Sequence, residues 1–260
     1  ETSANVVRIS DALGLRALRR ALEELLAAWD VDQIVEYPAS VVGAGIVKFA
    51  ESHGFSINRL DVSLGQLMVL NCPLLIEVDF GGGVYWLALL RVEGSDVFVT
   101  SASGEVESVS ISVLESAYRN SAVALWRDPY VYQEPLRLTH QGEAVWELQH
   151  DLVDLGVLKQ EPNGVYDAET ADAIARVQGV CGLREDGVFG AQSRMVLASW
   201  LNENNGPHLS SKAFPAGVLD SMLARTVGRR GSLLSVRRGP SRESVTEPVG
   251  GVVPLVPSRN

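Results

Sequence analysis

Residues 138–201, LTHQGEAVWELQHDLVDLGVLKQEPNGVYDAETADAIARVQGVCGLREDGVFGAQSRMVLASWL, determine how the whole chain is interpreted. Apolar residues recur at spacings of three and four over 142–155, which predicts an amphipathic helix that ends at Gly156. Two further helices are expected after the Gly-containing turns at 164–170 and 186–193. We therefore expect this stretch to fold as a small domain of three helices.

The two turns between these helices resemble each other. GVYDAETADAIARVQ starts at Gly164 and GVFGAQSRMVLASW starts at Gly187, so each has Gly, Val and an aromatic residue in that order. Glycine permits the positive φ angle of a tight turn, and the aromatic ring can pack beneath the helix start. Asp167 can cap the helix that follows the first turn. The pattern indicates a weak internal repeat of a turn followed by a helix.

These motifs, in this order, are similar to those of the peptidoglycan-binding domains attached to bacterial cell-wall enzymes. Val177 stands where that family usually has Phe, and Ser193 where it usually has Thr. The matched positions are Gly142, Val145, Leu148, Gln149, Leu155, Gly156, Gly164, Tyr166, Asp167, Thr170, Val177, Gln178, Gly182, Leu183, Asp186, Gly187, Gly190 and Ser193.

The resemblance implies a ligand made of glycan strands and short peptide stems with carboxylates and amides. A shallow site for it needs hydrogen-bonding side chains and a cation. The two glutamines could instead tie loops together, and the arginines could be solvated. The candidate binding residues are Gln149, Tyr166, Arg176, Gln178, Arg184 and Arg194.

The charge of the chain limits its function. Its 260 residues favour two domains, and no apolar run reaches the roughly 18 residues that a membrane-spanning helix needs. The net charge of −10 argues against nucleic acid as a partner, because that binding depends on neutralising phosphates. Residues 202–260 carry eight Lys/Arg and four Asp/Glu, so the tail is basic and the body acidic.

The first part of the chain has a pattern of helices followed by strands, which is typical of an α+β domain. Leucines from Leu15 to Leu26 fall on one face of the first helix together with Trp29. We expect helices at 11–29, 41–52, 64–69 and 113–118, and strands at 73–79, 84–92, 96–100 and 106–111.

This order of elements resembles the papain-like cysteine peptidases that remove double-glycine leaders from bacteriocins. Those enzymes place a Cys at the start of the first helix, a His after the Gly-rich turn and an Asp at the end of the next strand. Here the His position holds Tyr85, the Asp position holds Thr100 or Ser101-Ala102, and no Cys precedes Cys72. Tyrosine, with a pKa near 10, is a poor general base at neutral pH. The resemblance therefore implies an inactive peptidase-like domain.

The cysteines and histidines predict no cofactor and no metal site. Cys72 and Cys181 are far apart and neither belongs to a CxxC pair, so we expect two buried thiols, with an interdomain disulfide as the alternative. The four histidines do not share ligand spacing with carboxylates.

The sequence thus divides into an α+β peptidase-like domain at 1–128, a linker at 129–137 and a three-helix peptidoglycan-binding domain at 138–203. A mostly disordered tail is expected at 204–260. This pair of domains resembles the periplasmic region of the general secretion pathway protein A family of Gram-negative bacteria. In that family a cytoplasmic ATPase and one transmembrane helix come first, and a chain that starts at Glu1 without Met is compatible with such a truncation.

The resemblance implies non-catalytic peptidoglycan binding in the periplasm, by the soluble part of a single-pass inner-membrane protein. The role would be to support assembly of the type II secretion secretin through the wall, with the secretion pathway B protein and the secretin as partners and a homo-oligomer left open. One alternative is a wall hydrolase or peptidase that uses 138–201 for targeting. Another is a scaffold that binds only proteins and has lost its wall ligand.

Overall fold

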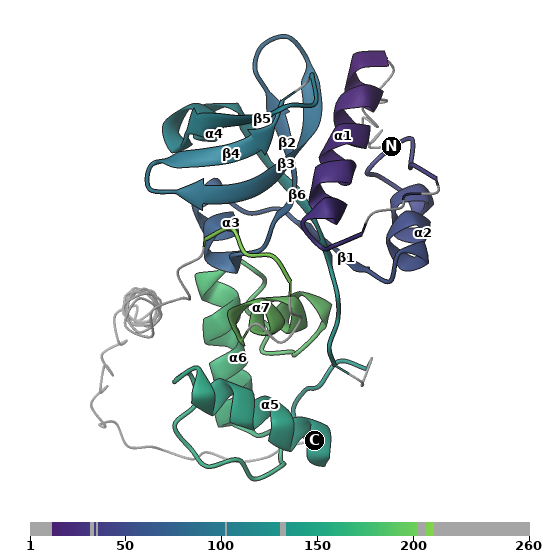
Figure 1. The fold of residues 1–260 in the computed structure, drawn as a ribbon. Coiled ribbons are helices and arrows are strands. Elements are labelled where there is room, and N and C mark those ends of the chain that lie inside the picture. Colours follow the sequence, from purple (N-terminus) through teal and green to yellow (C-terminus); the bar gives the residue numbers. More distant parts are fainter. Residues whose placement is uncertain are drawn as a thin grey trace, which may run out of the picture.

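The computed structural model describes residues 12–31, 34, 36–101, 103–130, 134–201 and 206–210. It places an antiparallel sheet with helices above a group of three helices (Figure 1). The predicted α+β class is confirmed. Across the described residues, no helix has the length and apolar character that crossing a membrane requires.

Six antiparallel strands form one sheet with the order β1-β6-β2-β3-β4-β5. The pairing of β2 with β3 aligns Leu74 with Leu89, and both side chains are fully buried. In this order β6, the last strand in the sequence, lies between β1 and β2. The strands are β1 (Ser56–Leu60), β2 (Leu74–Asp79), β3 (Val84–Glu93), β4 (Asp96–Thr100), β5 (Val106–Ser110) and β6 (Tyr118–Trp126).

The four predicted strands correspond to β2, β3, β4 and β5, but β1 and β6 were not predicted. β1 has the short and largely polar sequence SINRL, and β6 begins with the polar run Arg119-Asn120-Ser121. Both are strands because they pair with each other, from Ser56 opposite Trp126 to Leu60 opposite Ala122. Pairing across so long a stretch of sequence leaves no local periodicity to detect.

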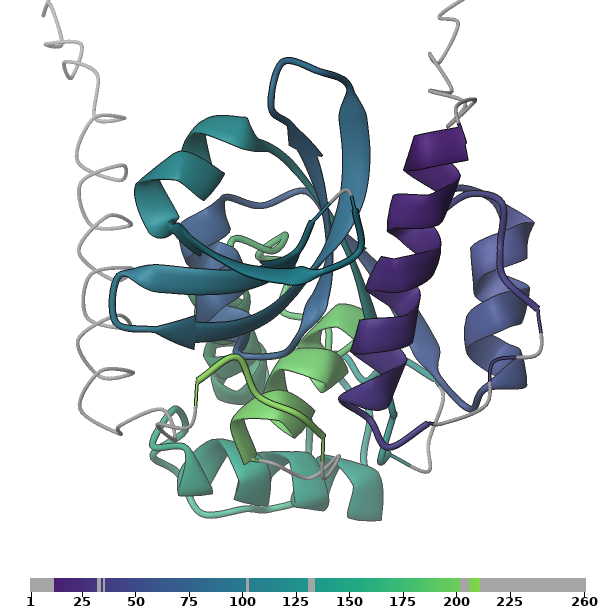
Figure 2. The same cartoon turned by 45° about the horizontal axis from the view of Figure 1, so that its top comes forward.

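Four helices accompany the sheet, and α1 lies along it next to α2 (Figure 2). Leu18, Leu22, Leu25 and Leu26 of α1 are buried, but Leu15 is 41% exposed, so its predicted place in the apolar stripe was wrong. The predicted caps at residues 10 and 11 lie outside the described residues. These helices are α1 (Ala12–Ala27), α2 (Ala44–Ser52), α3 (Leu64–Leu70) and α4 (Ile111–Ala117).

The sheet with α1–α4 is called the first unit, or sheet domain, and the three helices that follow it in the chain are called the small unit. The three predicted helices of the small unit are α5 (Glu143–Asp154), α6 (Ala168–Val180) and α7 (Ala191–Leu201). The stripe of α5 is buried at Val145, Leu148 and Leu152. Residues 193–199 of α7 are all buried, because this helix packs against α6 and against α3 of the sheet domain.

Hydrogen bonds join α7 to the first unit at both of its ends. Near its start, Asn58 Nδ2 donates to the Ala191 carbonyl at 3.1 Å. Near its end, Ser199 Oγ donates to the Leu70 carbonyl at 2.7 Å, and Trp200 Nε1 donates to the Val69 carbonyl at 2.9 Å. The third helix of the small unit is therefore also the one that attaches it to the sheet domain.

Residues 206–210 differ from the expectation of a tail that starts at 204. The Leu209 side chain is buried, its N–H donates to the Asn71 carbonyl at 3.1 Å, and its carbonyl accepts from the Val92 N–H at 2.6 Å. Gly206 lies so close to the Trp29 ring that a Cβ at this position would be 2.3 Å from it. The chain thus returns from α7 to the first unit, and the rest of the predicted tail, 211–260, lies outside the described residues.

Candidate functional site

Gln149 of α5 holds together the first turn of the small unit. Its Oε1 accepts from the N–H groups of Asn163 and Gly164, both at 2.8 Å. Its Nε2 lies 2.9 Å from both the Val165 carbonyl and Thr170 Oγ1, which accept. Residues 163–170 are called the Gln149 turn below. A fully buried amide with these partners satisfies backbone groups that would otherwise be left unpaired.

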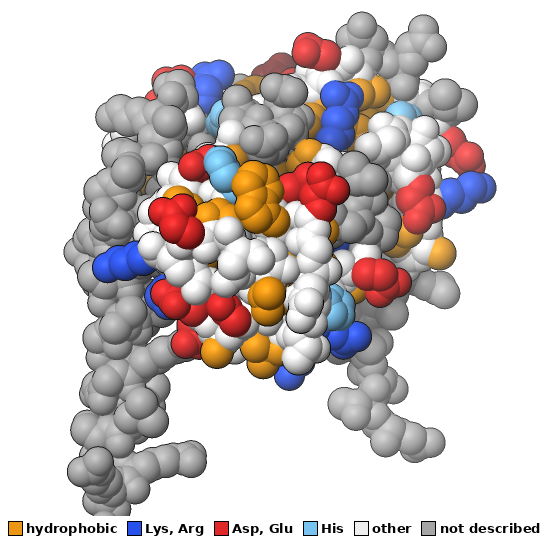
Figure 3. Space-filling model, turned by 90° about the horizontal axis from the view of Figure 1, so that it is seen from below, with side chains coloured by type: hydrophobic (Ala, Val, Ile, Leu, Met, Phe, Trp, Pro, Cys, Tyr) orange, Lys and Arg blue, Asp and Glu red, His pale blue; other side chains and the backbone are white. Residues whose placement is uncertain are grey.

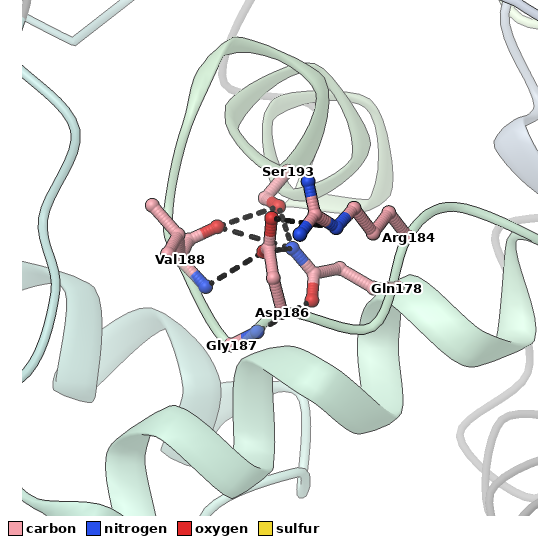
Figure 4. A network of polar contacts seen from close by, with 6 residues as sticks. All are labelled: Gln178, Arg184, Asp186, Gly187, Val188 and Ser193. Carbon is pink, nitrogen blue, oxygen red and sulfur yellow. Dashed lines mark hydrogen bonds and ion pairs between the residues drawn. The ribbon is translucent and has the colours of Figure 1, made fainter.

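Gln178 of α6 does the same for the second turn (Figure 4). Its Oε1 accepts from the Gly187 N–H at 3.0 Å, and its Nε2 donates toward Asp186 Oδ1 at 2.9 Å and the Val188 carbonyl at 3.1 Å. Ser193 Oγ lies 3.2 Å from the same nitrogen. Residues 186–193 are called the Gln178 turn below.

The two turns therefore use the same construction, in which a glutamine from the preceding helix bonds the Gly-Val backbone and the hydroxyl four residues after the aromatic residue. Leu136 forms a bridge with Phe189 of the Gln178 turn, and Gln141 forms one with Val165 of the Gln149 turn. The repeat predicted from the sequence is present in the structure. Both glutamines therefore tie loops together, which was the alternative to a role in ligand binding.

The aromatic residues of the two turns connect them. Tyr166 is buried, and its hydroxyl donates to the Gly187 carbonyl at 2.8 Å. Burial raises the pKa of Tyr166 well above its ordinary value, so the hydroxyl stays a protonated donor. Phe189 is also buried and meets the Tyr130 ring edge-on, with centroids 5.4 Å apart. Tyr166 therefore serves the core.

The three candidate arginines lie in different surroundings. Arg194 is buried, with Nε 3.1 Å from Asp128 Oδ2, so the expectation of solvated arginines does not hold for it. Arg176 is half-buried and donates to the Val157 carbonyl at 2.8 Å. Arg184 is 88% exposed, with Nε 3.9 Å from Asp186 Oδ2. Of the six candidates, only Arg184 presents an exposed side chain to a large ligand.

The outward face of α5 was not among the predicted binding positions. Trp146 there is 47% exposed, and its ring lies 5.4 Å from that of His150. Gly164 of the Gln149 turn lies beside Trp146, and the following Val165 is also exposed. The sequence did contain a signal for this exposed aromatic residue. Trp146 falls outside the apolar stripe of a helix that otherwise separates apolar and polar faces.

The residues predicted to stand at the peptidase-like positions make local contacts. The Tyr85 hydroxyl donates to the Gly82 carbonyl at 3.3 Å. Thr100 is fully buried, and its Oγ1 accepts from the Ala88 N–H at 2.8 Å, beside the irregularity in the β3–β4 pairing. Burial raises the pKa of the Cys72 thiol to about 12, which disfavours the nucleophilic thiolate.

Cys72 and Cys181 are both buried free thiols, as the sequence predicted. Burial, and then the neighbouring Cys72, raises the pKa of Cys181 far above its ordinary value. In the parts of the chain that the structure describes, no group of three His, Cys, Asp or Glu residues is arranged to hold a metal ion.

Residues 141–197 match the family model for the peptidoglycan binding domain. The match covers α5, α6, most of α7 and both turns. The chain therefore contains a peptidoglycan-binding domain, as its motifs predicted. A comparison with curated proteins gives no match.

Several solved structures are similar to this chain. A periplasmic domain of the EpsAB fusion protein of the Vibrio vulnificus type II secretion system is 22% identical, with 73% of this chain and 82% of that chain covered and a TM-score of 0.41. The SleB N-terminal domain is 29% identical, with coverages of 26% and 94% and a TM-score of 0.26. The peptidase domain of Streptococcus mutans ComA is 15% identical, with coverages of 38% and 85% and a TM-score of 0.30.

Proposed function

We propose that this chain binds peptidoglycan in the periplasm without catalysing a reaction on it. The observation that carries the proposal is the peptidoglycan-binding domain at 141–197, whose two glutamine-held turns are complete in the structure. The domain is fixed to the sheet domain through α7, so a wall-bound chain would present the sheet domain in a defined orientation.

The non-catalytic part of the proposal is supported by the peptidase-like positions. Hydrolysis by a papain-like mechanism needs a thiolate and a neighbouring general base. Here the Cys72 thiol is buried, and by the resemblance Tyr85 takes the expected His position and Thr100 or Ser101-Ala102 the expected Asp position. The sheet domain would then position the wall-binding domain or contact a partner.

The finer proposal concerns secretion. The order of the two domains resembles that of the general secretion pathway protein A family, so we propose a role in assembling the type II secretion secretin through the wall. The secretion pathway B protein and the secretin would be partners, and a transmembrane helix outside this sequence would anchor the chain in the inner membrane. In cells that depend on the full protein, deletion of 141–197 should lower the amount of secretin multimer in the outer membrane.

Co-sedimentation with purified peptidoglycan sacculi tests wall binding directly. The chain should sediment with sacculi above the level of a non-binding protein of similar size, and the supernatant should contain no released muropeptides. Failure to sediment would favour the scaffold that binds only proteins. Release of soluble muropeptides would instead favour the wall hydrolase.

A further inference from the structure

Three exposed side chains gather at the start of α5. Glu143 lies one helical turn before both Trp146 and Glu147, so the three side chains are neighbours on the outer face. Long side chains on a helix lean toward its N-terminus, which brings Trp146 toward Glu143. Viewed from below, this face of the molecule shows hydrophobic and histidine side chains among acidic ones (Figure 3).

The charges in this group lack an internal cation. Glu143 and Glu147 are like charges at neighbouring helical positions, an arrangement that destabilises a helix by itself. Within the described part of the chain, neither carboxylate pairs with a Lys or Arg. The imidazole of His150 lies 3.3 Å from Asp154 instead. The group therefore presents negative charge that an external cation could neutralise.

An exposed indole beside two carboxylates suits a particular cation. Ammonium groups bind over aromatic faces, best over Trp, and carboxylates add a direct electrostatic attraction. Gly164 lies next to the base of this side chain, since a Cβ there would be 3.8 Å from the Trp146 Cβ, an ordinary contact distance. This domain is also acidic as a whole, with eleven Asp/Glu and five Lys/Arg over residues 134–201, which opposes binding through the ligand's carboxylates.

This inference rests on the peptidoglycan binding proposed above and names the group recognised. We propose that Glu143, Trp146 and Glu147 bind the primary ammonium group of peptidoglycan stem peptides. The ammonium lies against the indole and between the carboxylates, and the glycan strand runs outside the protein. Stems whose amine is consumed in a cross-link are then poorer ligands than stems with a free amine.

The test compares untreated sacculi with sacculi whose amines have been N-acetylated, in quantitative co-sedimentation with the whole chain. Acetylation should weaken binding roughly fivefold, because it removes the cation. On untreated sacculi, Trp146→Ala and the double change Glu143→Gln with Glu147→Gln should each weaken binding by a similar factor. Phe80→Ala and Glu115→Gln are matched controls on the sheet domain, since both side chains are exposed, and they should bind as the parent chain does.

The outcomes separate this inference from the proposed function. If the parent chain does not sediment with untreated sacculi, both fail. If it sediments but acetylation leaves its binding unchanged, recognition of the ammonium group is overturned while peptidoglycan binding stands. If acetylation weakens binding but the α5 variants bind normally, with unchanged circular dichroism spectra, the ammonium site lies elsewhere and this assignment is overturned.

Discussion

The Gln149 turn and the Gln178 turn have the same internal construction but different surroundings. The Gln149 turn borders solvent, because Val165 is exposed and Gly164 lies beside the exposed Trp146. The Gln178 turn leads into α7, the helix that bonds to β1 and α3, and its Phe189 is covered by Tyr130. One copy of the repeat is thus available to a ligand, while the other is used to join the two units.

This difference explains why motif matching alone could not locate a binding surface. The matched residues are those that build the turns, and both copies keep them. What distinguishes the copies is the set of side chains outside the motif, such as Trp146 next to the first turn and Arg194 after the second. Changes to the shared residues should therefore affect the stability of both turns, whereas changes outside the motif should affect only one function.

The largest effect is expected at the junction that only the second copy serves. Arg194→Ala leaves the Asp128 carboxylate buried without its ion partner, and it should lower the free energy of unfolding by about 3–5 kcal/mol. Burial already raises the pKa of Asp128 above its ordinary value despite the attraction of Arg194. Without Arg194, the buried Asp128 side chain is more stable as the neutral, protonated carboxyl. The loss in free energy of unfolding should therefore be smaller at acidic than at neutral pH.

Chemical denaturation at two pH values measures this effect, with Arg184→Ala as the control. Arg184 is exposed, so its loss should change stability by no more than about 0.5 kcal/mol. A deficit for Arg194→Ala as small as that of the control would mean that the junction does not depend on the buried pair.

The shared construction is tested by removing each glutamine. Gln149→Ala and Gln178→Ala each leave partly or fully buried backbone N–H and carbonyl groups without their side-chain partner, and each should cost about 2–3 kcal/mol. Thermal unfolding of both variants, with the exposed Gln141→Ala as control, compares them. A large loss for one glutamine and almost none for the other would contradict the equivalence of the two turns.

Much of the fold could be predicted from the sequence because it is encoded locally. The helices of the small unit follow from apolar spacing and from glycines at turns, and Asp167 caps α6 as expected, through Thr170 N–H at 2.9 Å. The strands β1 and β6 could not be predicted, because their pairing joins residues far apart in sequence. The position of Leu209 on the sheet domain likewise depends on tertiary contacts.

The candidate site was less predictable. Glutamine, tyrosine and arginine can serve a ligand or the protein itself, and the choice depends on burial, which a motif does not show. Gln149, Gln178 and Tyr166 proved to be buried and bonded within the domain, and Arg194 proved to be part of the junction. Contact between the six candidates and peptidoglycan stays a prediction. Among the six, Arg184 has the most exposed side chain.

A smaller difference is expected between the turn glycines. Gly187 and Gly164 both have positive φ angles, of 66° and 72°, so alanine is strained at either position, by about 1–2 kcal/mol. A Cβ at Gly187 would also lie 2.9 Å from the Ala171 carbonyl oxygen, whereas one at Gly164 would lie 3.4 Å from that of Gly142. Gly187→Ala should therefore be the more destabilising of the two, by about 1 kcal/mol in thermal unfolding. Equal losses would show that the crowded turn relaxes without cost.

The smallest effect concerns the helix-cap position of the repeat, where the two copies differ in chemistry. Asp167 caps α6, but the corresponding residue before α7 is Gly190, which has no side chain to cap it. A Cβ at Gly190 would meet no atom within 4 Å, and its φ is not positive. Gly190→Ser should therefore add a cap and restrict the unfolded chain, which together stabilise by about 0.5–1 kcal/mol. A rise in melting temperature would show that the second turn accepts the chemistry of the first, whereas a fall would mean that contacts at the junction require glycine there.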